Sequence, residues 1–216
     1  MRRGGWQETV GTTLGGKIMG LIGLGRLGGR MAPIATAFGM DVVAWSRNLT
    51  DERAAEVGAR RVDKPELFRS ADVVSVHLQL GPSTTGIVGA DEIAAMKPGA
   101  ILVNTSRGPI VDEAALLAAL TSGRIRAGLD VDDAEPLPAD HPLRRAPNLV
   151  MTPHLGFVTE GAYREWYPDL IAGIGPVASC PFDFSEPISL LTRLRSALSV
   201  SASLRSFRRC PSSAAI

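Results

Sequence analysis

Three glycines stand directly behind an apolar run near the start of the chain, in a spacing that can bind a phosphate-bearing ligand. Residues 18–22 are apolar, and Gly23, Gly25 and Gly28 follow as G-x-G-x-x-G, with a helical pattern starting near Leu27. In such a motif the first glycine allows a tight turn, the second lets the backbone approach a pyrophosphate, and the third permits close packing of helix on strand. The helix N-terminus then presents free N–H groups to the phosphates. The pattern indicates a dinucleotide site; an ordinary strand–turn–helix connection without a ligand is the alternative.

Four polar segments follow apolar runs farther along the chain. They are Asn-Thr-Ser-Arg-Gly at 104–108, Leu-Asp-Val at 129–131, Glu-Pro-Leu-Pro at 135–138 and Thr-Pro-His-Leu-Gly at 152–156. In an open parallel sheet, ligands bind beyond the carboxyl ends of the strands. We therefore expect the ionisable side chains of these segments to converge on the rim that carries the glycine loop; they are Arg107, Asp130, Glu135 and His154.

Alternating strands and helices must position these segments. Short apolar runs predict strands at 18–22, 41–45, 73–77, 100–104, 125–131 and 149–151, and helical patterns lie between them at 27–38, 50–57, 91–96 and 112–122. Continuous apolar strands that alternate with helices indicate a parallel sheet covered on both faces. The predicted fold class is therefore α/β, a Rossmann-type doubly wound parallel sheet with helices on both faces.

The composition limits the classes of protein to which the chain can belong. It has 216 residues, of which 45% are hydrophobic and 21% charged, and a net charge of +1. These values predict a globular protein with no field that favours nucleic acid or a membrane surface. No apolar run follows the N-terminal arginines as in a signal peptide, and none is long enough to span a membrane. The only cysteines are Cys180 and Cys210, so we expect no metal site in the main body and a cytoplasmic location.

A change in composition divides the chain near residue 174. The alternating pattern runs from Leu14 to about residue 174, and residues 1–174 are predicted to form the dinucleotide-binding domain. Residues 175–216 are rich in Ser, Arg and Pro and are predicted to be a divergent tail. Within this tail we expect one amphipathic helix around Leu190–Leu198 and disorder beyond Ser199.

The ordered motifs resemble the NAD(P)-binding domain of the D-isomer-specific 2-hydroxyacid dehydrogenases, a family that includes phosphoglycerate, glycerate, and hydroxypyruvate or glyoxylate dehydrogenases. The resemblance runs from about residue 6 to residue 174. It rests on Gly-Leu-Gly-Arg-Leu-Gly at 23–28, the motifs at 104–108 and 129–131, Glu-Pro at 135–136 and Pro-His at 153–154. It implies hydride transfer between a nicotinamide cofactor and a D-2-hydroxy acid or 2-oxo acid.

Members of this family also carry a split substrate-binding domain. Its N-terminal lobe is absent from this chain, and the C-terminal return segment does not match after about residue 174. On this basis we expect a truncated gene product, an isolated domain, or a subunit completed by another chain. An absent lobe would leave water in the cleft and the substrate less well positioned.

The resemblance implies a role for each polar residue of the predicted rim. His154 corresponds to the acid/base that moves a proton on or off the substrate oxygen, and Glu135 to the carboxylate that orients its imidazole. Arg107 corresponds to the residue that holds the substrate carboxylate, to which a planar guanidinium is suited. Asp130 corresponds to a residue near the nicotinamide carboxamide. The other expected cofactor contacts are Gly23, Gly25, Arg26, Leu27, Gly28, Ser46, Arg47, Leu78, Thr105 and Gly156.

Each of these residues also has an ordinary structural interpretation when taken alone. A loop histidine, a surface cation, a solvated acid and a turn-forming aspartate would account for them one at a time. It is their joint order along the chain that favours a catalytic site. The two other histidines, His77 and His141, receive the structural interpretation, His77 as a wall residue beside the cofactor rim.

The end of the second predicted strand bears on the choice between NAD and NADP. An acidic residue usually stands here, about 20 residues after the glycine loop, and binds the ribose 2′-hydroxyl. This chain has Ser46 followed by Arg47. A carboxylate would repel a 2′-phosphate, whereas serine and arginine would accept one. We therefore expect NADP in preference to NAD; the alternative is that Arg47 points to solvent and NAD is used.

The sequence alone leaves three functions open. The chain could be a dehydrogenase acting on 2-oxo acids such as hydroxypyruvate or glyoxylate, a non-catalytic NAD(P)-binding module like the corepressor branch of the family, or an inactive truncated remnant. Turnover of 2-oxo acids with NAD(P)H would distinguish them. The expected partner is a small-molecule acid, with no nucleic acid and no membrane, and the resemblance also implies a homodimer.

Overall fold

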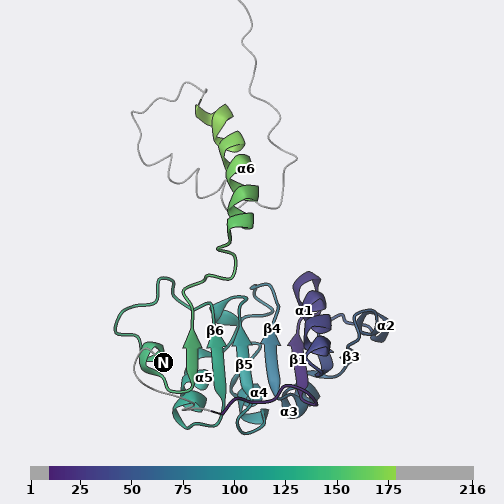
Figure 1. Cartoon of the computed structure of the whole chain (residues 1–216). Helices are drawn as coiled ribbons and strands as arrows, with labels where there is room; N and C mark the ends of the chain where they lie inside the picture. The colour runs from purple at the N-terminus through teal and green to yellow at the C-terminus, as the bar shows by residue number, and fades with distance from the viewer. Residues whose placement is uncertain (1–9, 179–216) are drawn as a thin grey trace, which may run out of the picture. The chain divides into compact units, whose positions relative to one another are not determined.

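The computed structural model describes residues 10–178 (Figure 1). Contacts within the chain divide it into two units, residues 1–159 and 160–216. All the described strands lie in the first unit, and the described part of the second unit is helix α6 (Glu160–Ala178). The domain boundary expected near residue 174 stays a prediction. The helix expected around Leu190–Leu198 and the disorder expected beyond Ser199 lie outside the described residues.

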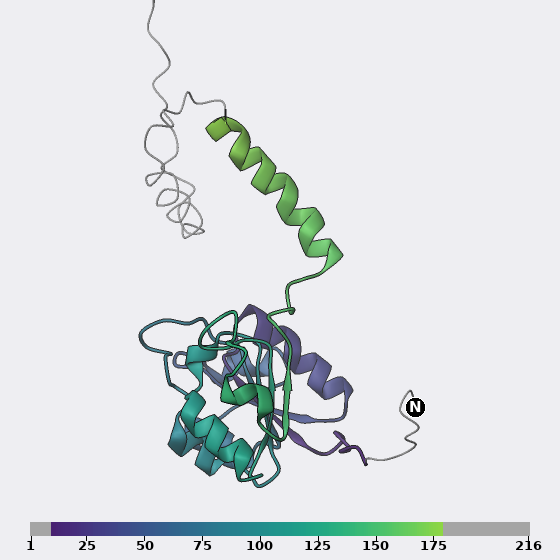
Figure 2. The same ribbon diagram turned by 90° about the vertical axis from the view of Figure 1, so that its left-hand side faces the viewer.

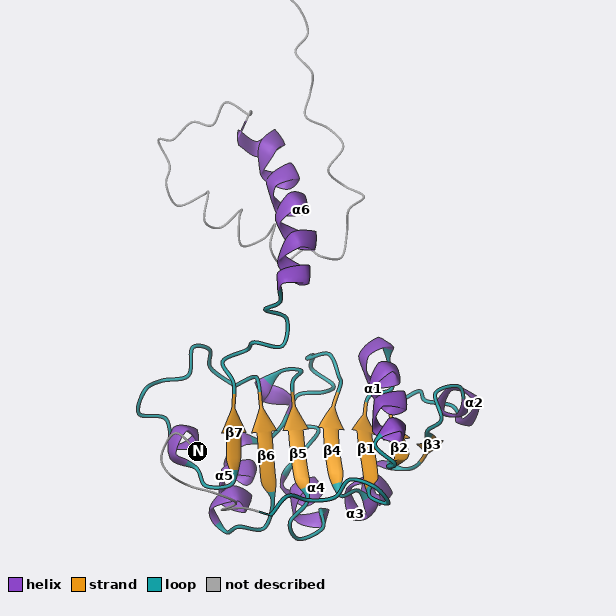
Figure 3. Cartoon of the chain, viewed as in Figure 1, coloured by secondary structure: helices purple, strands orange, loops and turns teal. Residues whose placement is uncertain are grey.

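Seven parallel strands form one sheet in the order β3-β2-β1-β4-β5-β6-β7 (Figure 3). They are β1 (Ile18–Ile22), β2 (Asp41–Trp45), β3 (Arg60–Arg61), β4 (Val73–Val76), β5 (Ile101–Asn104), β6 (Arg126–Leu129) and β7 (Leu149–Met151). The strand order reverses between β1 and β4, and ligands of such sheets bind at this point, beyond the carboxyl ends of the strands. The predicted Rossmann-type doubly wound sheet is confirmed.

Helices cover both faces of the sheet (Figure 2). On one face lie α1 (Arg26–Ala37) and α2 (Asp51–Ala55), and on the other lie α3 (Lys64–Ser70), α4 (Ala90–Ala95) and α5 (Glu113–Thr121). There are two short 3₁₀ helices. The first, η1 (Gly108–Ile110), follows β5, and the second, η2 (Pro142–Arg145), precedes β7. Within residues 10–178 no helix is both long and apolar enough to cross a membrane.

The central strands β1, β2, β4 and β5 are largely apolar because each of them contributes to two cores. In β1, the neighbouring side chains of Leu21 and Ile22 are both fully buried. Successive side chains of a strand point to opposite faces. Leu21 accordingly packs in the cluster under α1, and Ile22 packs in the cluster under α3, α4 and α5. Helices thus pack on both faces of the sheet. The polar segments lie at the rim formed by the carboxyl ends of the strands, which these helices do not cover.

Side-chain caps set where several helices begin. Thr50, Asp63 and Asp112 accept hydrogen bonds from the backbone N–H three residues later, at 3.2, 2.6 and 2.9 Å, and so start α2, α3 and α5. Three elements, β3, α3 and α6, and both 3₁₀ helices have no counterpart among the elements expected from the sequence. The Asp63 cap, with Pro65 in the first turn, is the signal that could have revealed α3.

Candidate active site

The glycine loop joins β1 to α1 at the point where the strand order reverses. Gly23 has a φ of +98°, and a Cβ at this position would lie 2.6 Å from the carbonyl oxygen of His77. Only glycine adopts this turn without strain. A Cβ at Gly28 would collide with the carbonyl oxygen of Gly23. The third glycine therefore permits the close contact of helix and strand that the motif predicts.

The first turn of α1 is suited to an anion. Gly25 is its N-cap residue, and nothing lies within 4 Å of the place that a side chain on Gly25 would take. The first turn contains no acidic residue, while Arg26 and Leu27 are both exposed there. The unpaired N–H groups of the helix end carry positive partial charge. This combination fits the pyrophosphate of a dinucleotide, which the loop backbone and Arg26 would hold.

Ser46 links the end of β2 to the glycine loop. Its Oγ accepts a hydrogen bond from the backbone N–H of Leu24 at 2.8 Å, and its own hydroxyl hydrogen stays available as a donor. Arg47 is exposed, and its guanidinium donates to the carbonyl oxygen of Ser83 at 3.2 Å. Ser46 and the glycine loop, predicted as one site from segments more than twenty residues apart, are thus in direct contact.

The ends of β4 and β5 complete the rim beside the loop. Leu78 packs against the loop, since a Cβ on Gly23 would lie 2.9 Å from its Cδ2. His77 Nε2 lies 3.0 Å from Ser75 Oγ, and burial lowers the pKa of His77. Burial thus favours the neutral form of His77, and its expected place in the wall of the cofactor site stays a prediction. Thr105 is exposed directly after β5.

A buried amide fixes the turn that carries Arg107. Asn104 is only 1% exposed; its Nδ2 donates to the carbonyl oxygen of Arg107 at 2.8 Å, and its Oδ1 accepts from the N–H of Ser106 at 3.0 Å. The hydroxyl of Ser106 donates to the carbonyl oxygen of Val76 at 2.8 Å, which ties the turn to the end of β4. The side chain of Arg107 is exposed and donates to the carbonyl oxygen of Ser106 at 2.6 Å. Asn104 was not among the expected site residues, although it opens the motif that contains Arg107.

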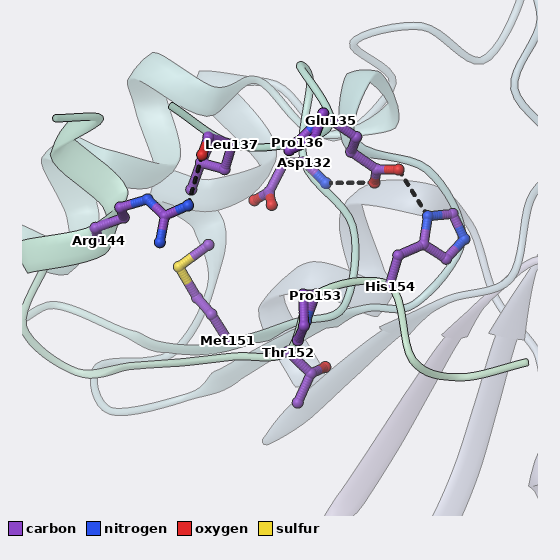
Figure 4. A pocket seen from close by; sticks show the side chains of 9 residues that line it. All are labelled: Asp132, Glu135, Pro136, Leu137, Arg144, Met151, Thr152, Pro153 and His154. Atoms are coloured by element: carbon purple, nitrogen blue, oxygen red, sulfur yellow. Dashed lines mark hydrogen bonds and ion pairs between the residues drawn. The ribbon is translucent and has the colours of Figure 1, made fainter. Parts of the chain in front are cut away.

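Glu135 and His154 form an ion pair, with Nδ1 of His154 at 2.7 Å from Oε2 of Glu135 (Figure 4). The other carboxylate oxygen accepts from the N–H of Asp132 at 3.1 Å. The hydrogen bond from His154 is the main cause that lowers the pKa of Glu135. The Asp132 N–H and the charges of His154 and Arg107 act in the same direction, against partial desolvation. A carboxylate can only accept, so Nδ1 carries a proton and Nε2 is left for a substrate.

Asp130 lies at the end of β6 and is bonded to the turn that carries His154. It is 6% exposed. Its carboxylate accepts from the N–H of Leu155 and the N–H of Gly156, each at 2.8 Å, and from the hydroxyl of Thr152. Burial by itself would raise the pKa of Asp130, but these hydrogen bonds and the charge of His154 lower it. The expected contact of Asp130 with the nicotinamide carboxamide stays a prediction.

A cavity of about 680 Å³ adjoins the ion pair (Figure 4). Besides Glu135 and His154 it is lined by Asp132, Pro136, Leu137, Arg144, Met151, Thr152 and Pro153. His141 lies outside this lining; it caps η2 and pairs with Glu113 at 3.3 Å, in keeping with its structural interpretation. Among residues 10–178, no group of three or more His, Cys, Asp or Glu side chains could hold a metal ion.

Comparisons with known proteins agree with this arrangement. Residues 1–156 match the model of the D-isomer specific 2-hydroxyacid dehydrogenase, NAD binding domain. The chain is 43% identical over 160 residues to a glyoxylate reductase from Aeropyrum pernix, and 44% identical over 160 residues to a D-3-phosphoglycerate dehydrogenase from Bacillus subtilis. Each alignment covers 73% of this chain, but 48% and 30% of the two relatives. The chain thus spans half or less of the length of these curated relatives.

Solved structures of the same family also resemble this chain. A phosphoglycerate oxidoreductase from Vibrio cholerae superimposes with a TM-score of 0.75 and 35% identity, over 80% of this chain and 58% of that one. The NAD-complexed form of a D-isomer specific 2-hydroxyacid dehydrogenase from Lactobacillus delbrueckii has a TM-score of 0.68 and 32% identity, with the same coverage. The glycine loop, the rim residues and these matches together assign the chain to the D-isomer specific 2-hydroxyacid dehydrogenase family, with residues 1–156 matching its NAD-binding domain.

Proposed function

We propose that this domain serves hydride transfer between a nicotinamide cofactor and a D-2-hydroxy acid or its 2-oxo acid. The observation that carries the proposal is the 2.7 Å contact between Glu135 and His154 at the carboxyl rim of the sheet. A nicotinamide supplies or takes up the hydride when it is bound. The substrate oxygen must then gain or lose a proton, and this second task falls to the protein.

His154 is the residue suited to move that proton. Its Nδ1–H is held by the carboxylate of Glu135, so the ring is oriented and Nε2 remains to donate to, or accept from, the substrate oxygen. The lowered pKa of Glu135 keeps its carboxylate ionised while this happens. The Glu135 charge also stabilises the imidazolium in the state that carries the proton.

Arg107 is the residue suited to hold the substrate. One of its nitrogens donates to the carbonyl oxygen of Ser106, which leaves other guanidinium N–H groups for a carboxylate. A planar guanidinium can bind a carboxylate through two parallel hydrogen bonds and fix the orientation of the acid. The buried Asn104 amide holds the backbone of Arg107 in place, so the side chain extends from a fixed point.

NADP is the proposed cofactor in preference to NAD. Two features support this: the end of β2 carries Ser46 and Arg47 in place of a carboxylate, and Ser46 contacts the glycine loop while keeping a free donor. A 2′-phosphate at this place would meet a hydroxyl donor and a nearby cation rather than a like charge.

The test is a fluorescence titration of the purified chain with NADPH and NADH, followed by addition of glyoxylate or hydroxypyruvate and measurement of cofactor oxidation. We expect binding of the cofactor, tighter for NADPH, and oxidation that is lost in His154→Gln. His141→Gln, at a histidine outside the site, is the matched control and should retain the activity.

Binding without oxidation would favour the alternative, a non-catalytic nucleotide-binding module. If neither nucleotide binds, the proposal is contradicted, and the result favours an inactive truncated remnant. The homodimer implied by the family resemblance stays a prediction.

A further inference from the structure

The backbone of His154 adopts a conformation that needs support. Its φ is +54°, in the left-handed region that a side chain larger than glycine seldom occupies. Such a conformation is strained and persists only when the surroundings enforce it. Within the turn itself, the N–H of His154 donates to the carbonyl oxygen of Thr152 at 3.1 Å. Something outside the turn must supply the rest of the constraint.

Three donors of this turn converge on one buried carboxylate. The two residues that follow His154 donate their N–H groups to different oxygens of Asp130, both at 2.8 Å, and the hydroxyl of Thr152 donates to the first of these oxygens. Asp130 itself sits at the end of β6 with 6% exposure, and its N–H donates to the carbonyl oxygen of Asn104 at 3.0 Å. The carboxylate therefore connects the rigid sheet to both sides of His154.

We propose that Asp130 is a positioning residue, which holds the 152–156 turn so that the imidazole of His154 meets Glu135. Charge-assisted hydrogen bonds to a buried carboxylate are roughly twice as strong as neutral ones. Three of them on one carboxylate hold the turn on both sides of the left-handed residue His154. The role does not require Asp130 to touch the cofactor, because the three hydrogen bonds that hold the turn are all made within the protein.

Gly156 contributes to the same arrangement. A Cβ on Gly156 would lie 2.9 Å from Oδ2 of Asp130, so a side chain here would push the carboxylate away from the N–H that it accepts. His154 also packs edge-on against Phe157, with ring centroids 5.4 Å apart and an interplanar angle of 88°. The imidazole is thus placed by its backbone and by a neighbouring ring, and Glu135 completes its orientation.

The proposal rests on the proposed function only for the task of His154, and it can be tested without turnover. The chain has three histidines, so the ring nitrogens of His154 can be assigned by ¹⁵N NMR with single histidine variants. In alkaline buffer, the wild type should show His154 protonated at Nδ1, because this nitrogen faces Glu135. Glu135→Gln supplies the reference spectrum for a ring that has lost its carboxylate partner.

Asp130→Asn is the central variant, since it keeps the shape but replaces one acceptor oxygen by a donor. We expect the Nδ1-protonated share of His154 to fall at least twofold, towards the Glu135→Gln spectrum. The NADPH Kd should change less than threefold. Asp72→Asn is the matched control: Asp72 also accepts a backbone N–H, from Ile18 at 2.9 Å, but at the other end of the sheet. It should leave the His154 signals unchanged.

Two outcomes would overturn the proposal. One is a folded Asp130→Asn protein with wild-type His154 signals. The other is a loss of NADPH affinity with His154 unchanged, which would mark Asp130 as a cofactor contact. If Asp130→Asn does not fold, Thr152→Val removes a single donor from the same carboxylate and should change the His154 signals in the same direction; unchanged signals there would also refute the proposal. Absence of turnover in the wild type would count against the proposed function alone, since the NMR comparison does not depend on it.

Discussion

Replacing Ser46 by aspartate should reverse the proposed preference for NADP. Ser46 is half-buried at the rim, and its Oγ accepts the N–H of Leu24 at 2.8 Å. An aspartate at this position can accept the same N–H, so the glycine loop should keep its conformation. The carboxylate would, however, bring a negative charge to the place where a 2′-phosphate would lie.

The size of the effect follows from Coulomb's law. Two like charges about 4 Å apart repel by about 4 kcal/mol at an effective dielectric constant of about 20. Because the rim is partly open to water, screening reduces this value, and we take about 1.5–2 kcal/mol as the expected cost. Every 1.4 kcal/mol is a factor of about ten in affinity. The ratio of the NADH Kd to the NADPH Kd should therefore fall about ten- to thirtyfold.

The assay is a fluorescence titration of each variant with NADH and with NADPH. Ser46→Asn is the matched control, since it has the shape of aspartate without its charge and should change the ratio far less. Arg47→Gln should weaken NADPH binding and leave NADH binding nearly unchanged. An unchanged ratio in a folded Ser46→Asp protein would refute the reasoning, as would an equal change in Ser46→Asn.

Three further predictions concern the framework of the domain. Gly28→Ala should lower the unfolding free energy by about 1–3 kcal/mol in denaturant titrations, because the new methyl group collides with the carbonyl of Gly23; Gly29→Ala, whose methyl would meet only side-chain atoms at 3.7 Å, should be neutral or stabilising by up to about 1 kcal/mol. Asn104→Ala should cost about 1–2 kcal/mol, measured in the same way, since it leaves two backbone groups of a partly buried turn unpaired. Burial opposes ionisation of Asp72, yet a backbone N–H and two lysines lower its pKa overall. Its contribution to stability is therefore present above the ordinary carboxyl pKa and is lost as the pH falls through the lower folded value, so Asp72→Asn should flatten the acid limb of a stability–pH profile.

The fold was largely predictable because its central strands are buried on both faces. An apolar run such as 18–22 or 100–104 can only be a strand of a covered parallel sheet when helices flank it. The glycine spacing after the first run then identified the turn at which the strand order reverses. By contrast, β3 consists of two exposed arginines at 60–61, and its pairing with β2 comes from the backbone, which leaves no hydrophobic periodicity to detect.

The residue types of the site were predictable, but most of its contacts were not. That Glu135 lies 2.7 Å from His154 depends on how the two loops after β6 and β7 fold back towards each other. Neither loop has a periodic pattern, so the family resemblance was the only source of that pairing. The bonds of Asn104 and Asp130 depend on where backbone N–H and carbonyl groups of irregular turns point. Such directions are set by local dihedral angles that composition and spacing do not specify.

Asn104 and Asp130 are buried like core residues, yet their hydrogen bonds go to the turns that carry Arg107 and His154. Exposed rim positions such as Arg47 can be exchanged at little cost in stability. A substitution at either buried position would alter folding and active-site geometry at once. During divergence, single substitutions can therefore change cofactor choice, while the geometry around the proposed catalytic side chains is under selection both for folding and for chemistry. The two buried residues should be among the last of the site to change in descendants that have lost the original activity but still fold.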